Sequence, residues 1–330
     1  MKNTFRQWHG EVFASIDLGT NNCRLMIAKP SLSGFSVIDS FSQITRLGEG
    51  LVSSENLSQK AMERTFKVLQ KCKEKISKYP ITKYRFVATE ACRRAGNGAE
   101  FISYVTEKLG LDFEIISPEQ ESELSITGCL PLVKPTTKSL IVFDIGGGSS
   151  EVSISNIKSN GEVDLIGIIS IPMGVLTVSE GFTGTDISDR ARKTISDKIN
   201  SAMELFDREN NVTDRIQKGG VQMIGTSGTV TSLGAFHLDL PHYNRNAVDG
   251  LTMSFAQVQK AREKLENMSN LERITHPCIG PQRADLTLAG CAILNAICNF
   301  WKLDELTVAD RGLREGILID LIRKNKSKTK

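Results

Sequence analysis

The chain has 330 residues, of which 40% are apolar and 24% charged, and its formal net charge is +3. This composition is that of ordinary globular proteins, which excludes a chain that is disordered as a whole. The small charge is spread along the sequence, which argues against a dedicated duplex-binding protein. At roughly 150 residues per domain, the length indicates about two domains.

The seven cysteines are an odd number without a C-x-x-C pair, and the four histidines lack the spacing of a zinc site. This pattern favours free, buried thiols in a reducing compartment. No uncharged apolar run reaches about eighteen residues, and the N-terminus has no apolar run of signal length. We expect a soluble, cytoplasmic protein with no membrane partner. The basic tail Arg323–Lys330 is interpreted as a solvated end, with a nucleic-acid arm as the alternative.

The first part of the chain alternates between strand and helix patterns. Strands are predicted at Phe13–Asp17 and Arg24–Ala28, within 34–50, and at 84–89 and 112–117. From Ser58 to Tyr79 apolar residues recur near the 3.6-residue period, and Ser58 suits the N-cap. A second helix is predicted over 98–110. Such alternation implies a sheet covered by helices.

A polar, proline-bearing stretch over 131–138 suits a linker, and a second α/β pattern follows it. Further strands are predicted at 140–155, Val163–Ile171 and Val221–Ile224, and helices at Asp186–Asn210, Phe255–Met268 and Ala284–Trp301. The last helix, over 311–325, is amphipathic and needs a partner surface. We therefore expect one domain over residues 1–132 and another over 133–330, with the last helix a candidate to pack back on the first.

Two stretches repeat one pattern around Asp17 and Asp144, which are 127 positions apart. An apolar run leads to Asp-x-Gly, small polar residues and a second apolar run. Glycine allows close backbone approach, and the free N–H groups form an anion cradle. One such turn more often closes an ordinary hairpin, but two in matching contexts favour phosphate binding. The phosphate-binding candidates are Gly19, Thr20, Asn21 and Asn22 in the first turn, and Gly146, Gly147, Gly148, Ser149 and Ser150 in the second.

Carboxylates accompany both turns, and a third glycine loop follows them. Asp17, Asp144 and Glu151 are candidate ligands for Mg²⁺, directly or through water, beside a phosphate. The third loop follows Val221–Ile224 and opens a helix, where N–H groups and the positive helix end can meet an anion. A purely structural turn is the alternative. The phosphate-binding candidates of this loop are Gly225, Thr226, Ser227 and Gly228.

Six segments in a fixed order cover nearly the whole chain. They are DLGTNN (17–22), TEACRRAGN (89–97), SPEQESEL (117–124), DIGGGSSE (144–151), GTSGT (225–229) and DRGLREG (310–316). Together they resemble the exopolyphosphatase and guanosine pentaphosphate phosphatase family, within the actin, sugar-kinase and chaperone ATPase superfamily. The T-x-x-x-R-x-A-x-N and S-x-E-x-E segments make the resemblance specific, because the kinases of the superfamily lack them.

The resemblance implies an α/β fold of two ribonuclease-H-like, actin-like domains with a cleft between them. It implies hydrolysis of a terminal phosphoanhydride, which releases orthophosphate from inorganic polyphosphate or the 5′ γ-phosphate of guanosine pentaphosphate. Mg²⁺ is the expected cofactor, with another divalent cation and K⁺ as further candidates, and a homodimer is the expected assembly. No specific nucleic acid is expected as a partner.

The resemblance also assigns two side chains. The catalytic base of the family falls on Glu121, and the phosphate-clamping arginine of the T-x-x-x-R segment falls on Arg93. From spacing alone, a solvated acid at a helix start is the stronger interpretation of Glu121. Arg46 is a further candidate, with a surface salt bridge as the alternative.

The chain departs from the family pattern in places and leaves rivals open. Asn22 stands where many relatives have a hydroxyl, Pro118 replaces a glycine, and Ser122 and Glu123 replace a common Ala-Arg pair. The lost arginine beside Glu121 leaves the substrate preference open. The chain stops soon after D-x-x-L-R-E-G, as in the short two-domain form, so processivity is not implied. The rivals are an ATPase or kinase of the superfamily and a non-catalytic sensor of guanosine penta- or tetraphosphate.

Overall fold

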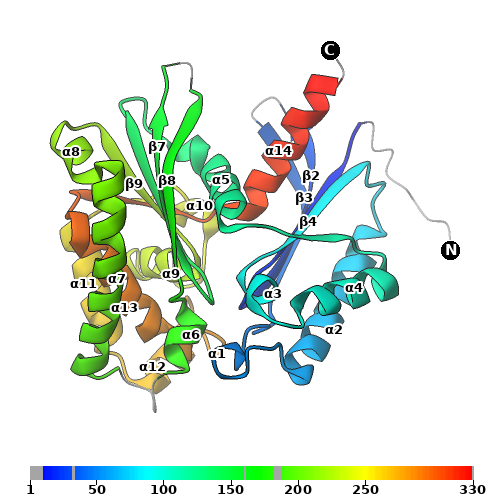
Figure 1. The fold of residues 1–330 in the computed structure, drawn as a ribbon, viewed down its shortest axis with the longest axis horizontal. Helices are drawn as coiled ribbons and strands as arrows, with labels where there is room; N and C mark the ends of the chain where they lie inside the picture. Colours follow the sequence, from blue (N-terminus) through cyan, green and yellow to red (C-terminus); the bar gives the residue numbers. More distant parts are fainter. Residues whose placement is uncertain (1–9, 32–33, 160, 182–186, 329–330) are drawn as a thin grey trace. The chain divides into compact units, whose positions relative to one another are not determined.

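The structure is a computed structural model that describes residues 10–31, 34–159, 161–181 and 187–328 (Figure 1). It divides into two compact units. Unit 1 consists of the chain up to Ser117 together with the segment from Leu313 onward, and unit 2 is Pro118–Gly312. This division differs from the boundary expected after residue 132. The reason is the helix α5 (Pro118–Cys129), which packs on the sheet of unit 2.

Unit 1 is built on a five-stranded sheet in the order β3-β2-β1-β4-β5. The β1–β2 and β2–β3 pairs are antiparallel, and the β1–β4 and β4–β5 pairs are parallel. The central strand β1 is buried along its whole length, as its apolar sequence predicts. The strands are β1 (Phe13–Leu18), β2 (Asn22–Ser31), β3 (Gly34–Ile44), β4 (Lys83–Ala88) and β5 (Phe113–Ile115).

Helices from both ends of the chain cover this sheet. The side chain of Ser58 caps α2 by accepting a hydrogen bond from the N–H of Ala61, which confirms the predicted helix start. The last helix, α14, packs on β1, β2 and β4 of the same unit. The helices of unit 1 are α1 (Leu51–Ser54), α2 (Gln59–Ile76), α3 (Glu90–Arg94), α4 (Gly98–Leu109) and α14 (Leu313–Lys328).

Helix α14 closes a small apolar cluster of unit 1. Leu318 and Ile322 of α14 pack with Phe13, Met26 and Ala28 of β1 and β2. Leu318 is fully buried. The amphipathic pattern at the end of the chain therefore has its partner surface on the first sheet.

Replacing Leu318 by alanine is expected to lower the free energy of unfolding by about 2–5 kcal/mol, because a buried leucine is lost and a cavity remains. The drop is measured by urea unfolding. Arg323→Ala, at an exposed position of the same helix, is the control and should change stability little. Equal stability of the two variants would contradict the packing of α14 on the sheet.

Unit 2 repeats the topology of unit 1 and adds one strand. Its order is β10-β11-β9-β6-β7-β8. The β6–β7–β8 meander is antiparallel, and β6, β9 and β11 are mutually parallel, so five strands match unit 1 in order and direction. The antiparallel edge strand β10 is the addition. The strands are β6 (Ser139–Ile145), β7 (Ser150–Ile157), β8 (Val163–Ile171), β9 (Val221–Thr226), β10 (Thr252–Ser254) and β11 (Glu305–Ala309).

Several helices of unit 2 pack on the apolar helix α13, among them α6, α7 and α11 (Figure 1). Among the described residues, α13 alone is long and apolar enough to cross a membrane, and 72% of it is buried inside the structure, as in a core helix. Besides α5, the helices are η1 (Leu130–Leu132), α6 (Val175–Ser179), α7 (Asp189–Asn210), α8 (Val212–Gln217), α9 (Gly228–His237), α10 (Arg245–Val248), α11 (Phe255–Glu266), α12 (Asn270–Thr275) and α13 (Ala284–Trp301).

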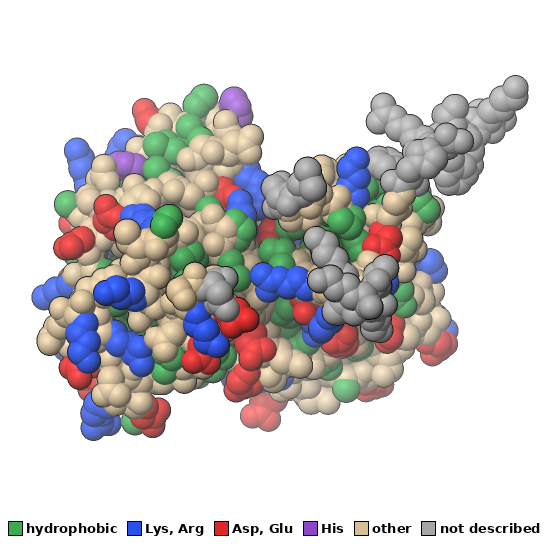
Figure 2. Space-filling model, turned by 90° about the horizontal axis from the view of Figure 1, so that it is seen from above, with side chains coloured by type: hydrophobic (Ala, Val, Ile, Leu, Met, Phe, Trp, Pro, Cys, Tyr) green, Lys and Arg blue, Asp and Glu red, His purple; other side chains and the backbone are tan. Residues whose placement is uncertain are grey.

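The fold class is confirmed as two α/β units of ribonuclease-H-like, actin-like topology, and the cleft between them stays a prediction. The helix predicted at Ala284–Trp301 is confirmed to the residue. The predicted helix start at Asp186 lies outside the described residues, as does the last part of the basic tail. All seven cysteines are free and buried, as expected. Figure 2 shows basic and acidic side chains interspersed over the visible face.

Candidate active site

The two glycine turns have the same backbone closure. In the first, the N–H of Gly19 donates to the carbonyl of Asn22 over 2.9 Å. In the second, the N–H of Gly146 donates to the carbonyl of Ser149, also over 2.9 Å. Each turn joins the two strands of an antiparallel hairpin in the middle of its sheet. The hairpins are β1–β2 and β6–β7. The sequence repeat therefore corresponds to one structural motif that occurs once in each unit.

The two hairpins differ in the charge beside the turn. Asp17 lies opposite Arg24 in the ladder, whereas Asp144 lies opposite Glu151. Arg24 Nη1 is 3.4 Å from Asp17 Oδ2. A guanidinium suits a phosphate, and a pair of carboxylates suits a hard cation. The turns are thus alike in backbone and different in the ligand charge that they favour.

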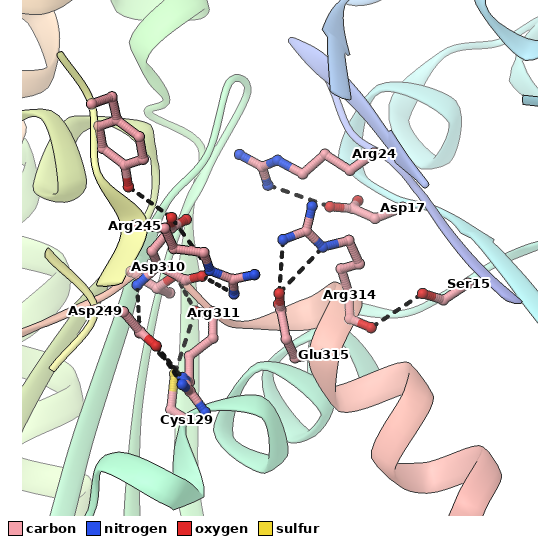
Figure 3. Close-up of polar contacts among 12 residues, drawn as sticks. Ser15, Asp17, Arg24, Cys129, Arg245, Asp249, Asp310, Arg311, Arg314 and Glu315 are labelled. Carbon is pink, nitrogen blue, oxygen red and sulfur yellow. Dashed lines mark hydrogen bonds and ion pairs between the residues drawn. The ribbon is translucent and has the colours of Figure 1, made fainter. Parts of the chain in front are cut away.

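Asp17 belongs to a group of alternating charges in unit 1 (Figure 3). Burial raises the pKa of Asp17, and the nearby guanidinium groups of Arg24 and Arg314 oppose this rise. Arg314 donates to the carboxylate of Glu315 over 2.7 Å, and its carbonyl accepts a hydrogen bond from Ser15. Neither Arg24 nor Arg314 was predicted as a site residue from the sequence pattern. A signal for Arg24 was present, because it follows Asp17 by the same interval by which Glu151 follows Asp144.

A second segment of unit 1 fixes the backbone of the first turn. The N–H groups of Thr45 and Arg46 donate to the carbonyl of Asn21 over 2.8 and 3.0 Å, and that of Gly48 donates to Thr20 over 3.0 Å. A Cβ at Gly48 would lie 2.4 Å from Cγ2 of Thr20, so any larger residue here would displace the Thr20 side chain. The segment 45–48 therefore determines where Thr20 and Asn21 lie.

Arg64 of α2 holds this segment in turn. Its guanidinium donates to the carbonyls of Thr45 and Arg46, the latter over 2.8 Å, and to the carboxylate of Glu49 over 2.9 Å. These charge-assisted hydrogen bonds connect a regular helix to an irregular loop. Arg64 thereby supports the first turn from outside it.

Replacing Arg64 by glutamine is expected to raise KM for a phosphate substrate about tenfold and to change kcat less, because the phosphate-binding turn loses its support. Steady-state kinetics measure both constants. Lys67→Gln, an exposed position on the same helix, is the control. An unchanged KM in Arg64→Gln would show that the turn keeps its shape without this side chain.

Arg93 lies at the sheet edge where the first turn begins. Because β1 and β4 are parallel, the first turn and α3 leave the sheet at the same edge. The Arg93 guanidinium donates to the carbonyl of Ile116 over 2.6 Å and to the carboxylate of Glu90 over 2.9 Å. The bond to Ile116 fixes α3 to the end of β5, and the bond to Glu90 lies within α3. Phosphate contact by Arg93 stays a prediction.

In unit 2 three predicted carboxylates meet. Glu121 of α5, Asp144 of β6 and Glu151 of β7 line one cavity of about 10 Å³. Pro118 is the first residue of α5, a position that proline favours, and acids in the first helical turn suit the helix dipole. The replacement of glycine by Pro118 thus strengthens the helix start that carries Glu121.

The second turn is tied to its surroundings by its hydroxyls. Oε1 of Glu151 accepts hydrogen bonds from Ser149 over 2.5 Å and from Ser170 over 2.8 Å. The hydroxyl of Ser150 donates to the carbonyl of Met173 over 2.6 Å. Ser149 therefore orients Glu151, and Ser150 anchors the turn. Because both hydroxyls are used in this way, a phosphate at the turn would be bound by backbone N–H groups.

The carboxylates differ in how well they fit a cation. No group of three or more His, Cys, Asp or Glu side chains in the described ranges has the arrangement of a metal site. Asp17 lies beside Arg24 and Arg314, which disfavour a bound cation. Asp144 and Glu151 form a cross-strand pair of hard oxygen donors, which fits Mg²⁺ when phosphate or water supplies the other ligands.

The third glycine loop begins beside the second turn, since Thr226 of β9 lies opposite Asp144 of β6. The hydroxyl of Thr226 donates to the carbonyl of Arg311 over 2.7 Å and is therefore used inside the unit. The guanidinium of Arg283 lies within 3.8 Å of where a Cβ at Gly228 would stand. The predicted loop is shorter than expected, because Gly225 and Thr226 belong to β9. Ser227 and Gly228 place their N–H groups at the start of α9, near the guanidinium of Arg283, which the sequence pattern did not single out.

Comparison with known proteins identifies the family to which this chain belongs. The family model described as the Ppx/GppA phosphatase family matches residues 26–325. The chain belongs to the Ppx/GppA phosphatase family. The resemblance found in the six sequence segments is thereby confirmed.

Solved structures of this family are similar over nearly their whole length. A Ppx/GppA family member from Aquifex aeolicus is 29% identical, covers 96% of this chain and 98% of its own, and has a TM-score of 0.76. For an exopolyphosphatase-like protein the identity is 26%, the coverages are 95% and 99%, and the TM-score is 0.85. An exopolyphosphatase from Cytophaga hutchinsonii shares the fold. Its identity is 21%, the coverages are 95% and 98%, and the TM-score is 0.83.

Proposed function

We propose that this Ppx/GppA phosphatase hydrolyses the terminal phosphoanhydride of a linear phosphate chain. Its substrate is inorganic polyphosphate, from which it releases orthophosphate, or guanosine pentaphosphate, from which it releases the 5′ γ-phosphate. The observation that carries the proposal is the meeting of Glu121, Asp144 and Glu151 around one small cavity beside a glycine turn. Family membership supports the hydrolytic reaction, and the finer substrate assignment is ours.

In this proposal Glu121 acts on the attacking water. A carboxylate within reach of a bound water accepts its proton or holds it in line with the phosphoanhydride. Helix α5 presents Glu121 from a rigid first turn that starts with proline. Accurate placement matters here, since the protein does little covalent chemistry in phosphoryl transfer.

The glycine turns and the arginines supply binding and charge neutralisation. The N–H of Gly146 closes the turn on Ser149, so the N–H groups of Gly147 and Gly148 are the ones suited to stabilise the transferred phosphoryl group. In unit 1, Arg24 and Arg314 lie near the first turn and would bind the negative charge of the remaining chain. That both turns grip one phosphate chain stays a prediction.

Asp144 and Glu151 are the residues that would hold Mg²⁺ or another divalent cation. Such an ion supplies charge neutralisation at the phosphoryl oxygens when bound. Ser149 and Ser170 keep Glu151 oriented for this role. A contact of the cation with Asp17, a requirement for K⁺, the homodimer and the cytoplasmic location stay predictions.

The test is phosphate release by the purified protein with Mg²⁺ from long polyphosphate, tripolyphosphate, guanosine pentaphosphate and ATP in parallel. We expect release from polyphosphate or guanosine pentaphosphate that is lost in a Glu121 variant. Release from ATP alone would contradict the proposal in favour of an ATPase. Binding of guanosine pentaphosphate without turnover would contradict it in favour of a sensor.

A further inference from the structure

The cavity at the candidate active site extends inward from the carboxylates. Ser125 lies four residues after Glu121 on α5, so both are on one helix face. Val142 precedes Asp144 by two residues and Ser153 follows Glu151 by two, so each shares a sheet face with its carboxylate. Ser122, Ser125, Val142 and Ser153 are all at least nine-tenths buried and line the same cavity.

Two serine hydroxyls at this cavity are unpartnered. In the described part of the chain, Oγ of Ser122 and Oγ of Ser125 are buried and have no hydrogen-bond partner. Ser153 differs, since its hydroxyl donates to the carbonyl of Val142 over 3.2 Å. Buried hydroxyls are costly when unpaired, and most are paired with protein or ordered water.

The cavity is large enough for one molecule of the size of water. Its volume of about 10 Å³ is close to the roughly 10–15 Å³ that one water molecule needs. A buried water requires two to four polar partners, and the cavity wall offers two unpartnered hydroxyls and three carboxylates. A water can accept a hydrogen bond from a serine and donate to a carboxylate at the same time.

We propose that a single water molecule occupies this cavity and is bonded to the hydroxyls of Ser122 and Ser125. By donating a hydrogen bond to the Glu121 carboxylate, this water holds the carboxylate in position. Ser122 and Ser125 are then positioning residues, which act on the reaction through the water and the Glu121 carboxylate. The water site stands on geometry alone, whereas its catalytic effect rests on the proposed function.

The site is tested directly by crystal structures of the wild-type protein and of Val142→Ile, at a resolution that shows ordered water. The added methyl group of isoleucine fills the cavity and leaves every polar group in place. We expect density for one water within hydrogen-bond distance of Ser122 Oγ and Ser125 Oγ in the wild type and none in the variant. A dry cavity, or an ion with five or more oxygen ligands, would overturn the proposal.

The catalytic effect is tested by kinetics on the substrate that the wild type hydrolyses. The Ser122→Ala/Ser125→Ala double variant and Val142→Ile are each expected to lower kcat roughly tenfold, the low end for lost supporting hydrogen bonds around a catalytic group. KM should stay within about twofold, since no substrate contact is removed. Thr127→Ala, whose hydroxyl bonds to Glu123 O on the same helix, is the control and should retain full activity.

The two readouts separate the possible failures. Wild-type kcat in both test variants, with melting temperatures confirming that they are folded, would overturn the positioning role. A wild-type protein that releases no phosphate from any substrate would refute the proposed function, and the crystal structures would still decide the water site.

Discussion

Replacing Glu121 by glutamine is expected to lower kcat for phosphate release at least about 100-fold, because a positioned acid–base group contributes 10² or more. Glutamine keeps the size of the side chain and can still hydrogen-bond to water, but it cannot accept a proton. KM should change by less than about threefold, since the group acts on the water and not on substrate binding. Initial rates at saturating and limiting substrate measure both constants.

The control for this prediction is Glu123→Gln, two residues away on α5 and exposed. It removes one negative charge from the same helix without touching the cavity, so it should keep nearly wild-type kcat. A Glu121→Gln variant that stays within about threefold of wild type would remove Glu121 from the reaction. Another carboxylate of the cavity would then be the candidate base.

Replacing Gly174 by alanine is expected to damage the second turn and the fold together. A Cβ at this position would lie 2.3 Å from the carbonyl carbon of Gly147 and 2.4 Å from the nitrogen of Gly148. These are backbone atoms, so no side-chain rotation relieves the clash. The N–H groups of Val175 and Leu176 donate to the carbonyls of Gly146 and Gly147, and these bonds would be strained as well.

We expect Gly174→Ala to lower the free energy of unfolding by about 1–3 kcal/mol, as overpacking does. We expect kcat/KM to fall on the order of 100-fold, because the phosphate-binding N–H groups move. Gly181→Ala is the control, since its Cβ would come no closer than 3.4 Å to its neighbour. Gly174 has φ −117°, which alanine adopts freely, so the expected damage comes from the close contact alone and not from the backbone conformation. Unchanged stability and activity would contradict the prediction and show that this contact relaxes at little cost.

The sequence predicted those parts of the fold that depend on local pattern. The β-hairpins with glycine turns, the long amphipathic helix α2 and the long apolar helix α13 follow from the strand and helix patterns of the sequence. The sequence could not predict that α5 belongs to unit 2, because a short helix pattern does not say which sheet the helix covers. That assignment depends on the contact of Ile126 and Cys129 with Leu140 and Val142.

The candidate site was predicted in its residue types and less well in its geometry. Asp144, Glu151 and Glu121 were all singled out, and the structure brings them together. Ser150 and Thr226 were predicted to bind phosphate, and the structure shows that the hydroxyl of each donates to a backbone carbonyl. Which way a hydroxyl points depends on neighbours distant in sequence, and sequence spacing does not contain that information.

The assignment of α14 to unit 1 has a consequence for how the protein is made. The strands β1 and β2 are translated before all of unit 2, whereas Leu318 and Ile322, which cover Phe13 and Met26, are translated after it. Unit 2 is continuous in sequence and can fold before translation ends. The sheet of unit 1 is therefore translated before that of unit 2 and is completed after it, and until α14 is translated its apolar face is exposed to aggregation.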